Sequence, residues 1–377
     1  MFYTPVQRFI YAAKSLYLSG NNIVLLRKAS AHIEAESSDG SPKNICLIIG
    51  ESYNKHHAHL YGYPLETTPN LDQEKQNGNL YVFSDAVTEY NYTTYCMQSI
   101  LSLKKKDEYW ANAPMLPALF KAAGFHTEYI SDQETYSSCS DWNLTTSSYL
   151  FDKKLNLFDA CNDYTFEYDG DLVETYKRIR TRGSQPNFTI FHLIGQHIFA
   201  QFRYPPSYAY FTGDSIIRPD LTPGQRNDIA FYDNATRYND FVVEEIIHLF
   251  RDEDAVIIYI SDHGEEIYDS VIHYGRTFGE VLTPDVCRNQ FEIPLLIWVS
   301  NRFREAHPDQ TERIAQAVNR PVSIDNIPHT LLDLAQIRTA HFDRTRSFVN
   351  DQFNKDRPRF VNAVNNNKRM NYDEIMK

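Results

Sequence analysis

The sequence predicts an α/β fold in which a mostly parallel sheet is covered by helices on both faces. Short apolar runs rich in β-branched residues alternate along the chain with longer segments of helical periodicity. This alternation is typical of parallel sheets whose connections are helices. A chain of 377 residues is long enough for one large α/β domain or two ordinary ones, and no linker marks a boundary between two.

The expected strands are apolar runs bounded by polar residues, Gly or Pro. In chain order they cover residues 44–50, 126–131, 188–195, 255–261 and 294–300. The expected helices repeat apolar residues on one face, and the first of them stops at Gly124. In chain order they cover residues 113–123, about 170–182, 226–250 and 324–336.

Two segments, residues 132–168 and 198–225, have little periodicity and many Ser, Asn, Tyr and Pro residues. Long segments without regular structure usually carry function, so we expect them to cross the active edge of the sheet as lids or substrate loops. Residues 341–377 are polar and rich in Asn, Arg and Asp. They predict a surface tail that packs on the domain or trails from it.

The first 39 residues form a basic, amphipathic segment. Residues 1–33 contain four Lys or Arg residues and no acidic one, against a net charge of −12 for the chain. This segment either lies on an anionic bilayer surface or forms a first helix packed on the domain. We expect neither a membrane span nor a signal peptide, because no run of 18 apolar residues and no cleavage pattern is present. The net negative charge argues against nucleic acid as a partner.

Two of the expected strands end in residues that bind metals. The strand at 255–261 runs into Asp262 and His263, and the strand at 44–50 runs into Glu51. In open α/β sheets the reactive groups collect beyond the carboxyl ends of the strands. Either tip alone would be an ordinary strand end, but carboxylates and an imidazole from two tips are typical divalent-metal ligands. The pair predicts one metal site assembled from distant parts of the chain.

A hydroxyl-rich segment lies between these two tips in the sequence. Residues 85–102 change from polar residues to a short amphipathic run, which predicts a loop leading into a helix. A helix N-terminus offers backbone N–H groups that suit phosphate. Thr93 and Thr94 would lie at the N-terminus of this helix. A threonine in this place either caps the helix or, in contact with a divalent cation, loses its proton and acts as a nucleophile.

Four histidines lie at or beyond strand tips. His192 and His197 belong to the end of the 188–195 run, and His273 follows His263 by ten residues. A lone histidine is usually structural or exposed. Several histidines from neighbouring tips favour contact with a metal or a phosphate.

These residues stand in motifs that closely resemble phosphoethanolamine transferases, which belong to the alkaline-phosphatase/sulfatase superfamily. The ordered set of motifs, within about residues 40–340, carries the resemblance. The segments are Gly50–Ser52, Tyr61–Pro64 with Thr67–Asn70, Gln196–His197, Tyr232–Ala235, Ser261–Glu265 and Ile324–Leu334.

The resemblance implies an alkaline-phosphatase-like α/β/α sandwich. Residues 40–340 would form the catalytic domain, residues 1–39 the connecting segment and residues 341–377 the tail. The family combines an N-terminal membrane bundle with a catalytic domain outside the cytoplasmic membrane. Since this chain resembles only the catalytic part, we expect it at the periplasmic face of the inner membrane.

The resemblance also implies which residues hold the metal. Glu51, Asp262 and His263 match three ligands of a tightly bound zinc ion, and a threonine completes the site as the nucleophile. His197 and His273 match histidines that bind the donor phosphate or a second zinc. A further histidine of the same site is matched by His192.

The choice of the threonine comes from alignment with the family. An ungapped alignment on Ser102 puts Asn91 opposite the usual nucleophile, but an amide cannot serve as one. Other members have Tyr-Thr, which fits Tyr92 and Thr93. We therefore expect Thr93 to be the nucleophile, with Thr94 as the alternative.

The implied activity is transfer of phosphoethanolamine from phosphatidylethanolamine to lipid A or a cell-envelope glycan at a membrane surface, through a covalent threonine intermediate. A phosphoglycerol transferase of the same superfamily is the nearest alternative. A sulfatase or phosphodiesterase fits less well, because residues 96–100 lack the Pro and Arg of the Cys/Ser-x-Pro-x-Arg sulfatase motif. A silent glycan-binding module is the alternative from another class, and the intact Glu51, Asp262 and His263 count against it.

We predict a disulfide between Cys139 and Cys161, which bracket a polar loop. The bond would restrain the loop and requires an oxidising compartment. Peptide mapping without reductant should recover one linked pair that separates on reduction. If both residues are found as free thiols, the pairing is wrong and the extracytoplasmic assignment is weakened.

Overall fold

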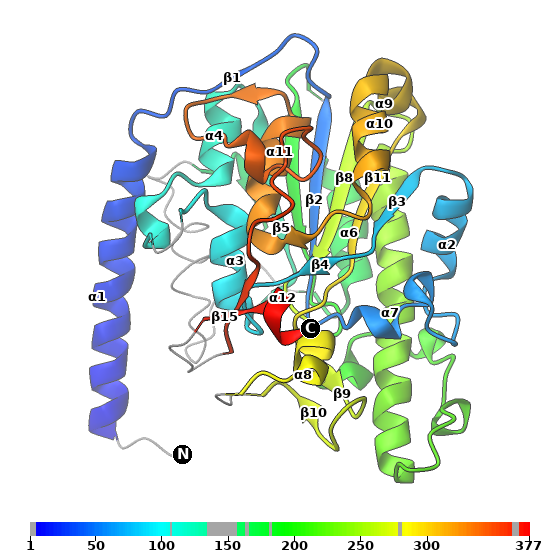
Figure 1. The fold of residues 1–377 in the computed structure, drawn as a ribbon. Helices are drawn as coiled ribbons and strands as arrows, with labels where there is room; N and C mark the ends of the chain where they lie inside the picture. Colours follow the sequence, from blue (N-terminus) through cyan, green and yellow to red (C-terminus); the bar gives the residue numbers. More distant parts are fainter. Residues whose placement is uncertain are drawn as a thin grey trace.

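The computed structural model describes residues 5–105, 108–133, 157–162, 166–180, 183–277, 281–363 and 369–377. Its centre is a seven-stranded sheet with the strand order β3-β11-β8-β2-β7-β5-β6 (Figure 1). β2 pairs in parallel with β7 and β8, and β5 pairs in parallel with β7 and β6. β11 runs antiparallel to both β8 and β3. The predicted α/β class with a mostly parallel sheet is confirmed. The strands are β2 (Asn44–Gly50), β3 (Leu80–Phe83), β5 (His126–Ser131), β6 (Ala160–Cys161), β7 (Asn187–His192), β8 (Ala255–Ser261) and β11 (Leu295–Val299).

Three of the strands predicted from the sequence match β2, β5 and β8 at both ends. The strand predicted at 188–195 ends earlier, at His192, because the chain then leaves the sheet to form the loop that carries His197. The edge strands β3 and β6 were not predicted. They have four and two residues, too few for a recognisable pattern.

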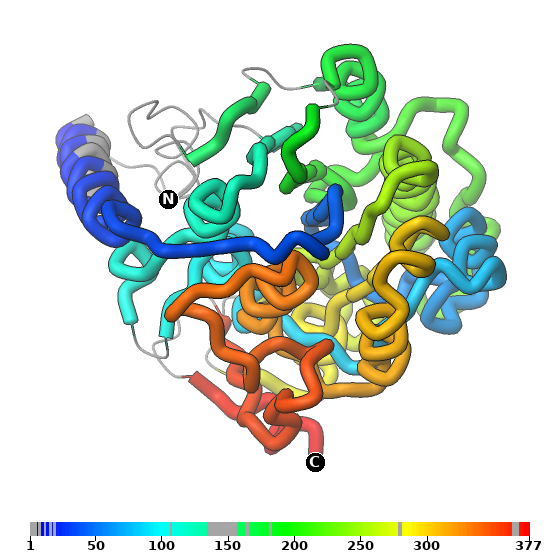
Figure 2. The backbone as a smooth tube through the Cα atoms, turned by 90° about the horizontal axis from the view of Figure 1, so that it is seen from above, coloured from blue at the N-terminus to red at the C-terminus, as the bar shows by residue number. Residues whose placement is uncertain are grey.

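The side chains of β2 alternate between two hydrophobic layers, since successive side chains of a strand point to opposite faces. Ile45, Leu47 and Ile49 contact the layer that holds α3 (Thr93–Leu101), α4 (Leu116–Ala122) and α11 (Ile327–Leu334). Cys46 and Ile48 contact the layer that holds α2 (Pro69–Gln76), α6 (Asp169–Ile179) and α7 (Pro223–Phe250). Figures 1 and 2 show helices on both sides of the sheet. Burial on both faces explains why β2 and β8 are continuously apolar.

The predicted helices correspond to α4, α6, α7 and the pair η8–α11. α7 begins earlier than predicted, because Thr222 and Gln225 form a capping box around Pro223. The remaining α-helices are α1 (Pro5–Ser30), α8 (Pro284–Gln290), α9 (Asn301–Ala306), α10 (Pro308–Ala317) and α12 (Tyr372–Ile375). Small strand pairs are β1 (Glu36–Ser37) with β13 (Ile337–Arg338), β4 (Ala86–Val87) with β12 (Val322–Ser323), β9 (Glu266–Ile267) with β10 (Tyr274–Gly275), and β14 (Phe360–Val361) with β15 (Met370–Asn371). Short 3-10 helices are η1 (Lys55–His57), η2 (His59–Tyr61), η3 (Trp110–Asn112), η5 (Ala200–Phe202), η6 (Pro206–Tyr208), η7 (Gly213–Ser215), η8 (Ile324–Asn326) and η9 (Arg344–Arg346).

The helix α1 lies along one side of the domain, at the left of Figure 1. Its second half is packed, because Leu26 is fully buried and the Tyr109 hydroxyl donates a hydrogen bond to Asn22 at 2.7 Å. Near its start Phe9 and Ile10 are exposed. Within the described residues, no helix combines the length and apolarity needed to cross a membrane.

The described residues of the C-terminal segment pack on the domain. Phe348 and Val349 join the layer around α3 and α11, and Val361 and Tyr372 join a smaller cluster with α8. Of the two predicted long loops, residues 198–225 form three short 3-10 helices, and most of residues 132–168 fall outside the described residues. Cys139 is among these, so the predicted disulfide stays a prediction.

Candidate active site

The parallel pairing of β2 with β8 brings two carboxylates together at the carboxyl end of the sheet. Gly50, the last residue of β2, is in register with Ser261, the last residue of β8. Glu51 and Asp262 follow these two residues directly, and both are fully buried. Burial of two carboxylates side by side is unfavourable unless a cation or hydrogen-bond donors compensate for it.

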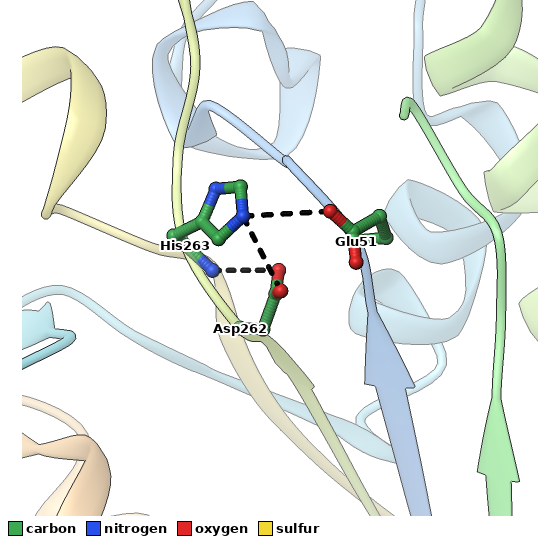
Figure 3. Close-up of side chains that lie close together, drawn as sticks. All are labelled: Glu51, Asp262 and His263. Carbon is green, nitrogen blue, oxygen red and sulfur yellow. Dashed lines mark hydrogen bonds and ion pairs between the residues drawn. The ribbon is translucent and has the colours of Figure 1, made fainter. Parts of the chain in front are cut away.

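His263 completes a cluster of three possible ligands, drawn in Figure 3. Its Nε2 atom lies 3.4 Å from Glu51 Oε1 and 3.4 Å from Asp262 Oδ2. The ligand atoms of the three residues all lie within 4.8 Å of one another. Carboxylate oxygen and imidazole nitrogen atoms gathered this closely are a typical zinc donor set.

Hydrogen bonds orient each of the three ligands. The backbone N–H groups of Ser52 and His263 donate to Asp262 Oδ1 at 3.0 and 2.7 Å. The ring of His263 contacts the Gly264 carbonyl through Nδ1 at 2.7 Å, so Nδ1 carries the proton. Nε2 is the ring atom that faces the two carboxylates, and a metal ion bound there would take the place of its proton. Among the described residues Asp262 Oδ2 has no hydrogen-bond partner, which fits the same ion.

The pKa shifts of these residues follow from burial and mutual charge. Burial raises the pKa of Glu51, but the hydrogen bond and charge of His263 outweigh it and hold that pKa well below its usual range. Burial and the charge of Glu51 raise the pKa of Asp262 to about 7. Burial lowers the pKa of His263, but the Asp262 carboxylate more than reverses this. The cluster therefore has one carboxylate that stays charged and one whose charge needs a cation.

Thr93 faces this cluster from the first turn of α3. Its Oγ1 atom lies 3.1 and 3.2 Å from the Glu51 oxygens and 3.4 Å from His263 Nε2. Thr94 is buried, and no described hydrogen bond joins it to the cluster. The side chain of Asn91 donates to Gln290 Oε1 and to the Thr277 carbonyl, so it ties together loops around the site. Of the two threonines, Thr93 is thus the one whose hydroxyl lies within 3.4 Å of Glu51 and His263.

The other predicted histidines occupy three different environments. His192 is fully buried at the end of β7, hydrogen-bonded to the Tyr129 hydroxyl at 2.9 Å, and burial lowers its pKa to about 4. His197 is half-buried near Glu51, and its pKa is lowered by burial. His273 is exposed in the turn between β9 and β10. The structure thus brings His192 and His197 to the cluster and leaves His273 at the solvent side.

Arg276 is a site residue that the sequence did not reveal. Its Nη1 atom lies 3.0 Å from His263 Nε2, and its guanidinium lies 5.4 Å from the ring centroid of Tyr92. Gln133, also missed, donates to Glu51 Oε2 at 3.2 Å. The sequence signal that could have revealed Arg276 is a basic residue that follows the Asp-His-Gly motif, three positions after His273. A guanidinium in this place suits a phosphate ligand.

The backbone around the cluster is closely fitted. A Cβ atom on Gly264 would lie 2.2 Å from the Asn289 carbonyl oxygen, so this position of the motif requires glycine. Ser52 has a φ of 56°, in the left-handed region that non-glycine residues rarely adopt. The Tyr232 hydroxyl supports this conformation by donating to the Ser52 carbonyl at 2.5 Å and accepting from the Asn54 N–H at 2.8 Å.

A buried ion network anchors the loop that carries Arg276. His57 contacts Asp233 of α7 through Nδ1 at 2.7 Å and Asp269 of the loop through Nε2 at 3.2 Å. Burial lowers the pKa of His57, but the carboxylates of Asp269 and Asp233 raise it to about 10, so the ring is charged. This charged bridge joins the loop to the longest helix of the fold.

An α/β sheet whose strand ends gather two carboxylates, an imidazole and a hydroxyl is the arrangement of the alkaline-phosphatase-like class. The chain belongs to the sulfatase family, whose model matches residues 43–337. This assignment agrees with the superfamily that the sequence motifs indicate.

Curated relatives carry the name that the motifs predict. The chain is 33% identical over 347 residues to phosphoethanolamine transferase EptC of Escherichia coli K12 and 32% identical over 352 residues to phosphoethanolamine transferase CptA of Salmonella typhimurium. These alignments cover 90% and 92% of the chain but 59% of each relative, so the chain spans about three fifths of their length. The resemblance to phosphoethanolamine transferases is confirmed.

Comparison with solved structures identifies the same family of proteins. The C-terminal periplasmic domain of EptC from Escherichia coli has a TM-score of 0.78 and 30% identity, covering 90% of this chain and 96% of that domain. A second structure of that domain is a complex with zinc, at the same similarity. A protein of the alkaline phosphatase superfamily from Vibrio parahaemolyticus, 18% identical with a TM-score of 0.54, shares the fold.

We predict that Glu51→Gln and Asp262→Asn lose zinc while the fold remains. Each change removes a charged ligand atom, so bound zinc after dialysis should fall at least about tenfold, the scale seen for losing even an outer-shell partner. Metal analysis by mass spectrometry measures the occupancy, and circular dichroism reports the fold. Asp254→Asn, at the opposite end of β8, is the matched control and should keep its zinc. Full zinc occupancy in both site variants would contradict the assignment.

Proposed function

We propose that this chain is the catalytic domain of a zinc-dependent phosphoethanolamine transferase. It would act at the periplasmic face of the inner membrane, with phosphatidylethanolamine as donor and lipid A or a cell-envelope glycan as acceptor. The observation that carries the proposal is the Thr93 hydroxyl within 3.4 Å of Glu51 and His263 at the end of a parallel sheet. The names of the curated relatives support phosphoethanolamine as the group transferred. In this proposal residues 40–340 form the catalytic domain, residues 1–39 connect it to the membrane, and residues 341–377 cover its side.

Thr93 would be the nucleophile of a two-step transfer. A zinc ion held by Glu51, Asp262, His263 and the threonine oxygen would lower the pKa of the hydroxyl and bind a phosphate oxygen. In the first step Thr93 Oγ1 forms a bond to phosphorus, the bond from phosphorus to the diacylglycerol oxygen breaks, and diacylglycerol leaves with a proton. In the second step an acceptor oxygen displaces the threonine, and the acceptor's proton returns to the hydroxyl.

The remaining site residues would neutralise and position the phosphate. The positive Arg276 guanidinium next to His263 can bind its equatorial oxygens, as can His197 from the loop after β7. The first turn of α3, which carries Thr93, would add backbone N–H groups, because the start of a helix leaves some of them without intrahelical acceptors. The site would thus combine positioning with charge stabilisation, the two sources of rate in phosphoryl transfer.

Assays of phospholipid cleavage distinguish this proposal from the alternative functions. The purified domain should release diacylglycerol from phosphatidylethanolamine in detergent, and a zinc chelator should abolish the release. Preference for phosphatidylglycerol would favour the phosphoglycerol transferase instead, and inactivity on every phosphodiester would favour the silent module. A sulfatase-type cysteine nucleophile does not fit, because Cys96 is fully buried and burial raises its pKa well above the usual value.

We predict that Thr93 carries the covalent intermediate. After incubation with phosphatidylethanolamine, mass spectrometry should find phosphoethanolamine on the peptide that contains Thr93. Thr93→Ala should lower transfer by at least about a thousandfold, as expected when a nucleophile is removed. Thr94→Ala is the control next to it and should keep measurable turnover. If instead only Thr94→Ala is inactive, the nucleophile is one residue further along the chain.

We also predict that His197 and His273 act on the phosphate rather than stabilise the fold. His197→Ala and His273→Ala should each lower transfer by roughly two to three orders of magnitude, the scale seen for losing one transition-state donor. The melting temperature should change little, because neither side chain fills a packed core. His341→Ala, an exposed histidine of the C-terminal segment, is the control. Wild-type activity together with a large loss of melting temperature would make the two residues structural.

A further inference from the structure

A cavity of about 750 Å³ lies between residues 89–90, 104–105 and 108–109, Asp325, and the C-terminal residues 343–360 and Arg369. Five basic side chains of the described residues line it, and we refer to it as the basic cavity. They are Lys104, Lys105, Arg346, Arg357 and Arg369. Such a gathering of cations is unexpected in a chain whose net charge is −12.

Two buried carboxylates organise these cations, and each has two of them as partners. Asp325 accepts hydrogen bonds from Arg346 at 2.8 Å and from Arg357. Burial raises the pKa of Asp325, but the two guanidinium groups hold that pKa well below its usual range. A guanidinium has five N–H donors, and Arg346 also uses its donors on the carbonyl oxygens of Lys104 and Asp325, at 3.2 and 2.9 Å.

The second buried carboxylate, Glu89, has the same arrangement. Arg369 lies 3.1 Å from one of its oxygens, and Lys104 lies 3.5 Å from the other, which also accepts from the Ser99 hydroxyl at 2.5 Å. Two carboxylates therefore face four cations. The local excess of positive charge is what an anionic ligand would neutralise.

The other two acids of the basic cavity are engaged locally. Glu108 accepts from the Lys105 backbone N–H at 2.9 Å, and Asp343 accepts from the N–H and hydroxyl of Thr345. The described residues that line the basic cavity thus comprise five basic and four acidic side chains, and their net charge is positive.

Aromatic rings connect the basic cavity to the catalytic centre. Tyr90 lines the cavity and packs against Tyr95 in a tilted arrangement, with ring centroids 5.2 Å apart. Tyr95 in turn lies 6.3 Å from Tyr92, whose ring carries the Arg276 guanidinium. Arg276 contacts His263 at 3.0 Å. A ligand held in the cavity would thus lie on a surface that leads to Thr93.

We propose that the basic cavity binds a phosphorylated sugar of the acceptor and so presents the acceptor to Thr93. This inference rests on the proposed function and names the chemistry that the acceptor must have. The volume suits a disaccharide-sized ligand, within the usual range for small-molecule sites. Guanidinium groups match phosphate oxygens, and the rings of Tyr90, Tyr109 and Phe360 offer apolar faces to a sugar. A concave site of this kind favours a saccharide over a flat membrane surface.

Calorimetry with a defined probe tests the site directly. The probe is a glucosamine disaccharide that carries two phosphate groups, titrated into the zinc-loaded protein without phosphatidylethanolamine. It should bind at least about tenfold more tightly than the same disaccharide without phosphate, because hydrogen bonds between charged groups are the stronger ones. Arg369→Gln and Lys105→Gln should each weaken binding of the probe about tenfold. Lys105 is exposed, so its variant keeps the test valid if Arg369→Gln does not fold.

Arg302→Gln is the matched control, since it removes one charge from an exposed residue of α9 away from the cavity. It should bind the probe as the wild type does. Unchanged binding in both cavity variants, or equal affinity for the disaccharide without phosphate, would overturn the proposal. So would displacement of the probe by phosphatidylglycerol vesicles but not by inorganic phosphate, which would make the cavity a membrane contact.

The outcomes also separate this inference from the proposed function. If the wild type cleaves phosphatidylethanolamine but Arg369→Gln and Lys105→Gln bind the probe normally, the acceptor site is wrong and the transferase stands. If the donor is not cleaved but binding depends on phosphate and on Arg369, the transferase is wrong and the basic cavity remains a site for phosphorylated sugars.

Discussion

Glu51 and Asp262 leave adjacent parallel strands at the same level, where both are shut away from water. Two like charges placed this close in a protein interior repel each other and lose their hydration. The surrounding structure compensates with an imidazole, backbone N–H groups, the Gln133 amide and the Arg276 guanidinium. In the proposed site a divalent cation would supply the remaining counter-charge, and the register of β2 with β8 determines where it would bind.

The layers around the sheet hold that register in place. β2 is the central strand, and its side chains are shared by both hydrophobic layers, so it cannot slide by one residue without turning its core side chains to the wrong face. The loop beyond β8 is then tied to α7 through the charged His57 bridge. Rigid strands carry the ligands, and an anchored loop carries Arg276. Both the three possible metal ligands and Arg276 are thereby held in fixed positions.

Much of the fold and the set of possible ligands could be predicted from the sequence. A strand that is buried on both faces is a continuous run of apolar residues, and here two such runs end directly before polar site residues. Glu51, Asp262 and His263 were found in this way. The edge strand β3 and the guanidinium of Arg276 were not, since a four-residue strand has no clear period and an isolated arginine has no local pattern. Conversely, the position of His273 ten residues after His263 in the sequence did not indicate that its side chain is exposed.

The hydroxyl of Tyr259 occupies the space where a side chain at position 50 would begin, since a Cβ atom there would lie 2.2 Å from the Tyr259 Oη. That hydroxyl also donates to Asn239 Oδ1 at 2.9 Å. A glycine just before the metal ligand and a tyrosine on the neighbouring strand are therefore one steric unit. During divergence of the family, a side chain at position 50 therefore requires a smaller residue at position 259. We therefore expect the residues at positions 50 and 259 to covary among members of the family.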